Sequence, residues 1–133
     1  MNRTTIGMLA AATGIKITTI RYYERAGLMP PPARTAGRHR NYTDDHQRRL
    51  LFICRARQLE FNIEEIRALL ALAEPARMSC REVHHVAAAH LKVLRQKITR
   101  LVKLEAMLAG AIARCSGKSK SPCPVLELLA APD

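Results

Sequence analysis

The stretch TIGMLAAATGIKITTIRYYERAGL, residues 5–28, decides the fold of the N-terminal part of the chain. Its first half predicts a short helix over residues 6–12 with an apolar face. Gly14 then signals a tight turn. A second helix is expected over residues 16–26 and should end at Gly27, because glycine readily adopts the left-handed conformation that follows a helix. Two short helices joined by a glycine turn predict a helix-turn-helix.

Beyond this stretch, the pattern predicts a basic hairpin and then more helices. Three prolines at positions 30–32 exclude a helix there. The basic segment over residues 34–42, with Ala-Gly at its centre, is typical of a short β-hairpin, or wing. Helices are expected over residues 44–59 and 63–73. We therefore expect residues 1–75 to form a winged helix-turn-helix domain.

A long helix is expected over residues 80–113, because no residue in this range breaks the helical pattern. At about 1.5 Å per residue it would span roughly 50 Å, too long to fold back on so small a domain. Apolar residues recur along it at spacings of three and four, which indicates a coiled-coil seam. An antiparallel or a parallel dimer would cover this seam; the alternative is a helix within an intramolecular bundle. The seam comprises Leu91, Leu94, Ile98, Leu101, the polar Glu105, Leu108 and Ile112.

The C-terminal part is expected to hold two further segments. Residues 76–114 are assigned to the dimerisation helix, and residues 115–133 to a polar loop and a short helix that begins at Pro124. Proline is favoured at the first position of a helix, because its missing N–H would have no partner there. The fold class predicted for the whole chain is therefore mainly α.

The charge of the chain favours a nucleic-acid partner. The 133 residues include 22 Lys and Arg against 11 Asp and Glu, a formal net charge of +11. The N-terminal half is the more basic, as in proteins that bind a polyanion; the alternative is that the charge only aids solubility. No long apolar run or signal-peptide pattern is seen, so a cytoplasmic protein is expected. No acid–base pair or nucleophile constellation indicates an enzyme.

Three of the four cysteines form a pattern around the long helix. Cys80 lies at its expected start, and Cys115 and Cys123 enclose the loop after its end. In a reducing cytoplasm such cysteines favour a metal or redox role over a structural disulfide. If two copies pair along the helix, Cys80 of one can meet the loop of the other and form a thiolate site for a soft metal. Cys54, on an apolar helical face, is expected to be an inert core residue.

The segment TIGMLAAATGIKITTIRYYERAGLMPPPARTAGRHRNYTDDHQRRLLFI resembles the MerR family of bacterial transcription regulators. That family combines a helix-turn-helix, an I-R-Y-Y-E-x-x-G-L stretch, a basic wing ending in R-x-Y, a helical pair and a long antiparallel dimerisation helix. All appear here in order, and the resemblance extends through CPVLELL. It implies a homodimer that binds double-stranded promoter DNA.

The second helix of a helix-turn-helix enters the major groove. Arg21 on this helix can reach a phosphate or a base edge. The resemblance implies that one of Tyr22 and Tyr23 contacts the DNA backbone and that the other packs inward. The basic wing suits phosphates or a minor groove. The expected DNA-binding residues are Thr18, Thr19, Arg21, Tyr22, Tyr23, Arg25, Arg38, Arg40 and Tyr42.

The cysteines resemble those of the metal-sensing branch of the family. There, two loop cysteines are joined by a residue at the start of the partner's helix, which is Ser in sensors of monovalent ions and Cys in sensors of divalent ions. Here that residue is Cys80. The resemblance implies Cys80, Cys115 and Cys123 as ligands of Hg(II), Pb(II), Cd(II) or Zn(II), with Hg(II) slightly preferred. His84 or His85 could add a nitrogen ligand.

Two alternatives remain for the effector. The segment between Cys115 and Cys123 is one residue shorter than in mercury sensors and has the length found in copper sensors, so a Cu(I)-type sensor is one alternative. A regulator that senses redox state through a disulfide is the other. For a metal sensor, the resemblance implies that the dimer holds a promoter with an overlong spacer. The effector then makes it bend and untwist the DNA for RNA polymerase.

Overall fold

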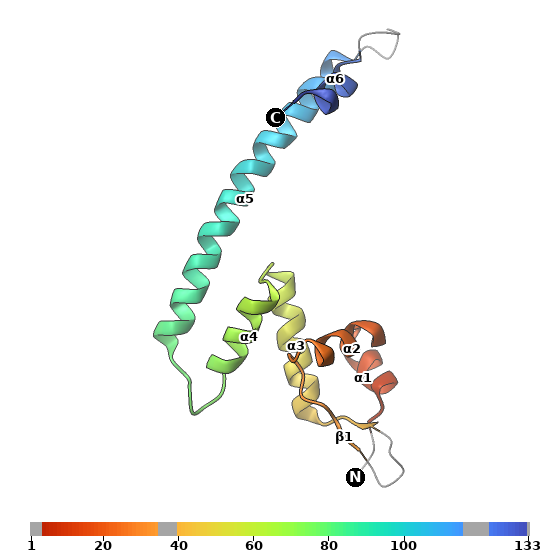
Figure 1. Cartoon of the computed structure of the whole chain (residues 1–133), viewed down its shortest axis with the longest axis vertical. Helices are drawn as coiled ribbons and strands as arrows, with labels where there is room; N and C mark the ends of the chain where they lie inside the picture. The colour runs from red at the N-terminus through yellow and green to blue at the C-terminus, as the bar shows by residue number, and fades with distance from the viewer. Residues whose placement is uncertain (1–3, 35–39, 116–122, 133) are drawn as a thin grey trace. The chain divides into compact units, whose positions relative to one another are not determined.

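The computed structural model describes residues 4–34, 40–115 and 123–132, and it confirms a mainly α-helical fold (Figure 1). Its contacts divide the chain into an N-terminal unit, Met1–Val86, and a C-terminal unit, Ala87–Asp133. Within the described part, no helix is both long enough and apolar enough to cross a membrane. The elements in chain order are α1 (Ile6–Thr13), α2 (Ile17–Arg25), β1 (Ala33–Arg34), β2 (Arg40–Asn41), α3 (Asp44–Gln58), α4 (Ile63–Leu72), α5 (Cys80–Arg114) and α6 (Pro124–Ala130).

The predicted helix-turn-helix is confirmed as α1 and α2. The side chain of Thr5 caps α1 by accepting a hydrogen bond from the Met8 N–H at 3.1 Å. The helix ends at Gly14, whose φ is 74° and whose N–H donates to the carbonyl of Ala10 at 2.8 Å. Gly27 follows α2 with a φ of 77°. Glycine adopts this left-handed conformation without the strain that a Cβ atom would cause, so these two residues fix where the helices stop.

The predicted wing is confirmed as a two-stranded antiparallel hairpin of β1 and β2. Ala33 pairs with Asn41, and Arg34 pairs with Arg40. The tip of the hairpin, residues 35–39, lies outside the described residues. The wing is therefore defined here by its base, which leads directly into α3.

Capping boxes start the two helices that follow the wing. In α3 the Thr43 hydroxyl accepts from the His46 N–H at 3.4 Å, and His46 Nδ1 accepts from the Thr43 N–H at 3.0 Å. In α4 the same exchange joins Asn62 and Glu65, at 2.8 and 2.9 Å. Each box satisfies backbone donors that the helix itself cannot pair. The starts of α3 and α4 are thus set by local sequence.

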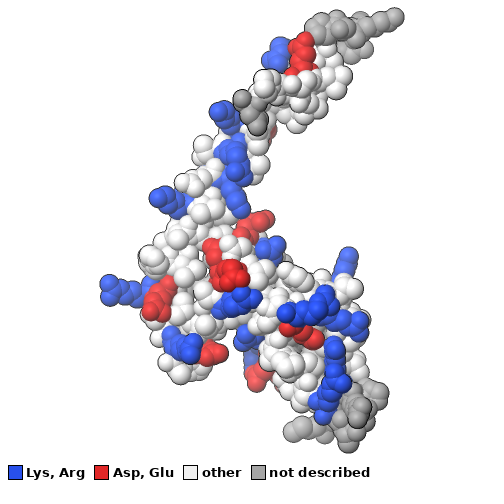
Figure 2. All heavy atoms as spheres, viewed as in Figure 1, with Lys and Arg blue, Asp and Glu red and all other residues white. Residues whose placement is uncertain are grey.

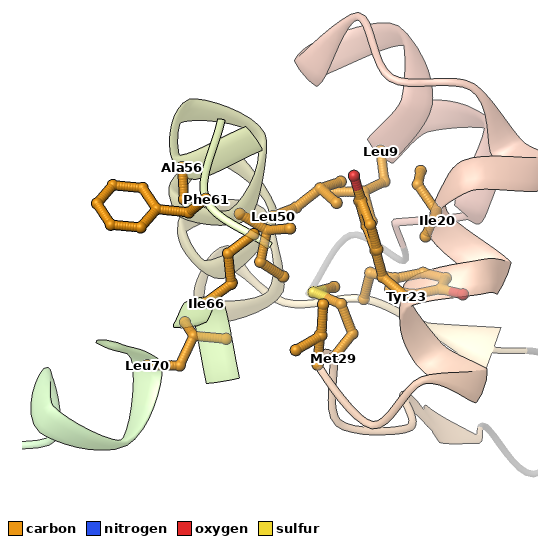
Figure 3. Packing of buried hydrophobic residues seen from close by; sticks show 12 residues of the cluster. Leu9, Ile20, Tyr23, Met29, Leu50, Ala56, Phe61, Ile66 and Leu70 are labelled. Carbon is orange, nitrogen blue, oxygen red and sulfur yellow. The ribbon is translucent and has the colours of Figure 1, made fainter. Parts of the chain in front are cut away.

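The core of the N-terminal unit is formed by apolar side chains from α1 to α4 that pack against one another (Figure 3). Leu9 of α1 is 1% exposed, and Ile20 of α2 and Ile66 of α4 are completely buried. Leu50 and Ile53 of α3 are also completely buried. Burial of such side chains contributes about 1.5–3 kcal/mol each. The core therefore holds α2 against the helices that follow it.

Two arginines form hydrogen bonds that connect the end of α2 to α3 and α4. Arg49 of α3 donates from Nε to the carbonyl of Leu28 at 2.5 Å, and Arg67 of α4 donates to the carbonyl of Ala26 at 2.6 Å. Both carbonyls belong to the segment that leaves α2, where backbone acceptors lack partners within the helix. These bonds fix the end of α2 relative to α3 and α4.

Replacing Glu60 with glycine should raise the free energy of unfolding by about 1 kcal/mol, because an L-residue in the left-handed region is strained. Glu60 follows the C-cap of α3 with a φ of 67° and, among the described residues, is the one non-glycine with positive φ. Urea unfolding of Glu60→Gly and Glu60→Ala would measure the effect. The alanine variant removes the carboxylate but keeps the Cβ atom. Equal stabilisation by both would show that charge, rather than backbone strain, is the cause.

Candidate DNA-binding surface and metal centre

Helix α2 has one face exposed to solvent, where its side chains could reach DNA, and one face packed into the core. Arg21 and Arg25 are exposed, and Tyr22 is 48% exposed, whereas Tyr23 is only 8% exposed. The two tyrosine rings lie 5.8 Å apart at an angle of 53°. The expectation that one of the two tyrosines packs inward is met by Tyr23, and the expected DNA contact of the other, Tyr22, stays a prediction. Of the other predicted residues on α2, Thr18 is exposed and Thr19 is half-buried.

Glu24 connects the recognition helix to the wing. The hydroxyl of Tyr42 donates to Glu24 Oε1 at 2.5 Å, and Arg40 forms an ion pair with Glu24 Oε2 at 3.3 Å. Tyr42 is only 2% exposed, and burial, aided by the bond to Glu24, raises the pKa of its phenol to about 12. The phenol thus stays protonated and keeps its bond at any ordinary pH. Tyr42 thus positions the wing, whereas the side chain of Arg40 remains partly exposed to solvent.

The importance of Glu24 was not predicted from the sequence, although a signal existed. Glu24 is the sole acidic residue among the first 43, in a segment rich in arginine. A lone carboxylate among cations is a candidate for an organising ion pair. Arg38, also predicted to contact DNA, lies outside the described residues. Figure 2 shows Lys and Arg side chains on the visible face of the N-terminal unit, with Asp and Glu side chains between them.

The predicted long helix is confirmed as α5, with 35 residues from Cys80 to Arg114. In the single chain most of its seam is exposed to solvent: Ile98 and Leu101 are each 59% exposed and Ile112 is 58% exposed, whereas Leu94 is half-buried. A partner that covered these leucine and isoleucine side chains would contribute a stabilising free energy of about 25 cal/mol for each Å² of apolar surface removed from water. The exposure therefore supports a partner helix along α5.

Two of the three predicted metal ligands lie together in the C-terminal unit. Cys115 follows the last residue of α5, and Cys123 is the N-cap of α6. Hydrogen bonds from the backbone N–H groups of Leu126 and Val125 lower the pKa of the Cys123 thiol; burial works against this, and the Cys115 thiol, in hydrogen-bonding contact, lowers it further. A thiol that readily becomes a thiolate is a good ligand for a soft metal. The pair therefore suits two of the three ligand positions of the predicted thiolate site.

Cys80, the third predicted ligand, begins α5 in the N-terminal unit and is exposed. Ser79 caps the helix there by accepting from the Glu82 N–H at 3.2 Å. Across the described residues, no group of three or more His, Cys, Asp and Glu side chains in one chain could hold a metal ion. His84 and His85 are exposed on α5, and the loop of residues 116–122 lies outside the described residues.

Cys54 lies on α3, well apart in sequence from the other three cysteines. It is half-buried and near Tyr23, whose phenol pKa is raised mainly by burial and to a lesser degree by Cys54. The expectation that Cys54 is a core residue is not confirmed, because it is half-buried and is not among the residues of the buried core cluster. All four cysteines are free thiols.

Comparison with known proteins identifies families that share this architecture. Residues 4–73 match the family described as MerR HTH family regulatory protein, and residues 47–111 match the one described as MerR, DNA binding. The chain is 37% identical over 121 residues to the HTH-type transcriptional regulator ZntR homolog of Haemophilus influenzae, a match covering 91% of this chain and 90% of that protein.

Two solved structures extend the likeness to metal complexes. The transcription regulator PbrR691 from Ralstonia metallidurans in complex with lead(II) shares 37% identity with a TM-score of 0.77, covering 96% of this chain and 99% of that one. The regulator MerR from Bacillus megaterium in complex with mercury(II) shares 32% identity with a TM-score of 0.66, at the same two coverages of 96% and 99%. Both matches span the helix-turn-helix and the long helix. The chain therefore belongs to the MerR family of helix-turn-helix regulatory proteins.

Proposed function

We propose that the protein is a transcription regulator that binds promoter DNA as a homodimer and responds to a soft divalent metal ion. As a member of a family of DNA-binding regulators it is not an enzyme. The observation that carries the metal assignment is the contact between the Cys115 and Cys123 thiols, with a lowered pKa at Cys123. Cys80 of the partner subunit would complete the site, because Cys80 and Cys115 of one chain lie at opposite ends of the 35-residue helix α5.

The proposed DNA contacts come from the exposed face of α2 and from the wing. Arg21, Tyr22 and Arg25 present charge and a hydroxyl to solvent, as expected of a helix that enters the major groove. Thr18, Thr19, Arg38 and Arg40 complete the proposed set. Tyr23 and Tyr42 are assigned positioning roles, because each is at least nine-tenths buried. A cytoplasmic location follows from the proposed partners, promoter DNA and RNA polymerase.

The proposed effector is Hg(II) slightly ahead of Pb(II), Cd(II) and Zn(II). Three cysteine thiolates alone suit a soft ion that takes three ligands in a trigonal arrangement, whereas zinc favours four ligands. Support comes from the two similar regulators whose structures were solved in complex with lead(II) and mercury(II). The thiolate pair supplies negative charge and polarisable sulfur, the features that such ions select.

The proposed mechanism uses metal binding to change DNA shape. A site shared by two subunits can fix their relative orientation, and with it the positions of the two recognition helices on the promoter. Bending and untwisting DNA costs on the order of a few kcal/mol, within the range that metal coordination can supply. The effector thus changes the shape of the bound DNA more than the fraction of promoter that is bound. The promoter elements that RNA polymerase recognises then lie in register.

Transcription in a purified system would test the effector. The protein, its promoter and RNA polymerase would be incubated with equal free concentrations of Hg(II), Pb(II), Cd(II), Zn(II) or Cu(I). We expect a divalent ion to raise the transcript level without changing promoter occupancy. Induction by Cu(I) alone would overturn the divalent assignment. Induction by an oxidant without any metal would favour the redox alternative.

A further inference from the structure

We propose that Glu105 of each subunit forms an ion pair with Arg95 of the partner subunit, and that this pair sets the orientation and the register of α5 in the dimer. The inference rests on the homodimer proposed above. It adds the contact that decides between a parallel and an antiparallel arrangement of the two helices. It begins from the single acidic side chain in the apolar seam.

Glu105 has no cation within reach on its own helix. It is the one acidic residue of α5 after Glu82, in a stretch rich in lysine and arginine. The positions three and four residues before and after it, which are its neighbours on the helix surface, hold only apolar residues. Its side chain is exposed in the single chain, and no ion pair of the described residues involves it. A partner helix that covers the seam must therefore supply a cation to this carboxylate.

A hollow on the same helix, called here the Arg95 hollow, offers such a cation. It has a volume of about 450 Å³, and its lining includes Lys92 and Arg95 but no Asp or Glu. Both basic side chains are exposed, and neither forms an ion pair within the described part of the chain. Ala88 and Leu91 add apolar surface to the lining. The hollow thus suits a glutamate, whose methylene groups can contact the apolar surface while its carboxylate reaches a guanidinium.

The heptad spacing predicts which residues meet when two copies of α5 pair in opposite directions. The apolar residues of the two helices stay in contact only in registers that differ by one heptad. In the register that brings Cys80 level with the loop after the partner's α5, Glu105 lies opposite Leu94 of the partner subunit. Arg95 is the next residue of that helix and flanks the covered seam. The register that the proposed metal site requires therefore brings Glu105 to the Arg95 hollow.

The same carboxylate opposes a parallel arrangement. In a parallel pair with both helices in register, identical seam positions face each other, so the two Glu105 side chains would meet. Two like charges in a covered seam destabilise the pair. In the antiparallel arrangement the twofold axis instead creates two Glu105–Arg95 pairs, one on each side of the axis. Glu105 thus favours the arrangement in which the ends of α5 that carry Cys80 and Cys115 can meet.

Charge reversal followed by mixing is the first test. Glu105→Arg and Arg95→Glu should each raise the dimer dissociation constant roughly tenfold, because the homodimer of either variant places like charges at both pairs. A mixture of the two variants should form heterodimers in preference to either homodimer, since each pair then joins an acidic and a basic side chain. Sedimentation equilibrium would give the dissociation constants, and native mass spectrometry after subunit exchange would give the fraction of heterodimer.

Two further variants separate the ion pair from a folding defect. Lys103→Glu is the matched control, since it reverses the charge of an exposed residue of α5 outside both the seam and the hollow. It should dimerise like wild type and pair with Glu105→Arg no more readily than wild type does. The double variant Glu105→Arg with Arg95→Glu restores both pairs within one kind of chain and should recover dimerisation. Failure of the double variant to recover, although it is folded by circular dichroism, would contradict the pairing.

The choice of partner decides the orientation. A stronger preference of Glu105→Arg for wild type than for Arg95→Glu would indicate that two Glu105 side chains face each other, and would overturn the antiparallel assignment. A stronger preference for Lys92→Glu than for Arg95→Glu would shift the register and overturn the assignment of Arg95. A wild-type chain that stays monomeric would instead overturn the proposed homodimer.

Discussion

Replacing Cys80 with serine should abolish metal-induced transcription and leave promoter binding unchanged. A serine hydroxyl is a poor ligand for a soft ion, so the site would lose one of its three thiolates. Changes outside the ligand shell already lower metal affinity by roughly 10- to 100-fold, and loss of a ligand should cost more. Cys80 is exposed at the first residue of α5, so the substitution should not affect folding.

Promoter occupancy, transcript level and bound metal should be measured on the same preparation. Cys54→Ala is the matched control, because Cys54 lies on α3 and has no proposed part in the metal site. It should keep both DNA binding and induction. Loss of promoter binding in Cys80→Ser would contradict the separation of the two activities.

Mixing two inactive variants would test whether the site is shared between subunits. One chain would carry Cys80→Ser and keep its loop cysteines; the other would carry Cys115→Ser with Cys123→Ser and keep Cys80. A mixed dimer contains one complete site only if the loop of one subunit meets Cys80 of the partner subunit. Metal binding restored after the two chains are mixed and refolded together would support the shared site. No recovery in dimers shown to be mixed would place all three thiols in one chain or exclude Cys80.

Local signals explain why most of the N-terminal fold could be predicted. Gly14 and Gly27 stop helices because of their conformational freedom, and the expected second helix, residues 16–26, is observed as Ile17–Arg25. The long helix expected over residues 80–113 is observed as Cys80–Arg114. In each case the residues that decide the element lie within it or next to it.

Interactions between distant residues were not predicted. Glu24 and Tyr42 are 18 positions apart, and their bond depends on how the wing packs against α2. A surface hollow beside α2 is another case, because its lining comes from α2, α3 and α4; the lining residues are Thr18, Thr19, Tyr22, Tyr23, Arg57 and Ile63. Glu60 occupies a left-handed position where the sequence offers no glycine as a signal. The metal site differs from these cases: the sequence predicts its three cysteines, and the third ligand, from another chain, stays a prediction.

Replacing Ile98 with glutamate should separate the dimer and, with it, abolish tight promoter binding. Ile98 lies near the middle of α5 and is 59% exposed in the single chain, so the folded subunit should tolerate the change. In an antiparallel pair the two mid-helix positions lie close together, and the variant would bury two like charges there. An unpaired buried charge costs several kcal/mol, enough to raise the dimer dissociation constant by about 1,000-fold.

Sedimentation equilibrium and promoter titration would show the two effects together. Thr99→Glu is the matched control: it adds the same charge one residue away, at an exposed position outside the seam. It should remain dimeric and bind DNA. Two recognition helices must reach two half-sites at once, so a monomeric Ile98→Glu variant should bind a full site no better than a half-site. If Ile98→Glu dimerises as strongly as wild type, the seam on α5 is not the dimer interface. The proposed metal site would then lose its structural basis, because it needs Cys80 of the partner subunit near the loop.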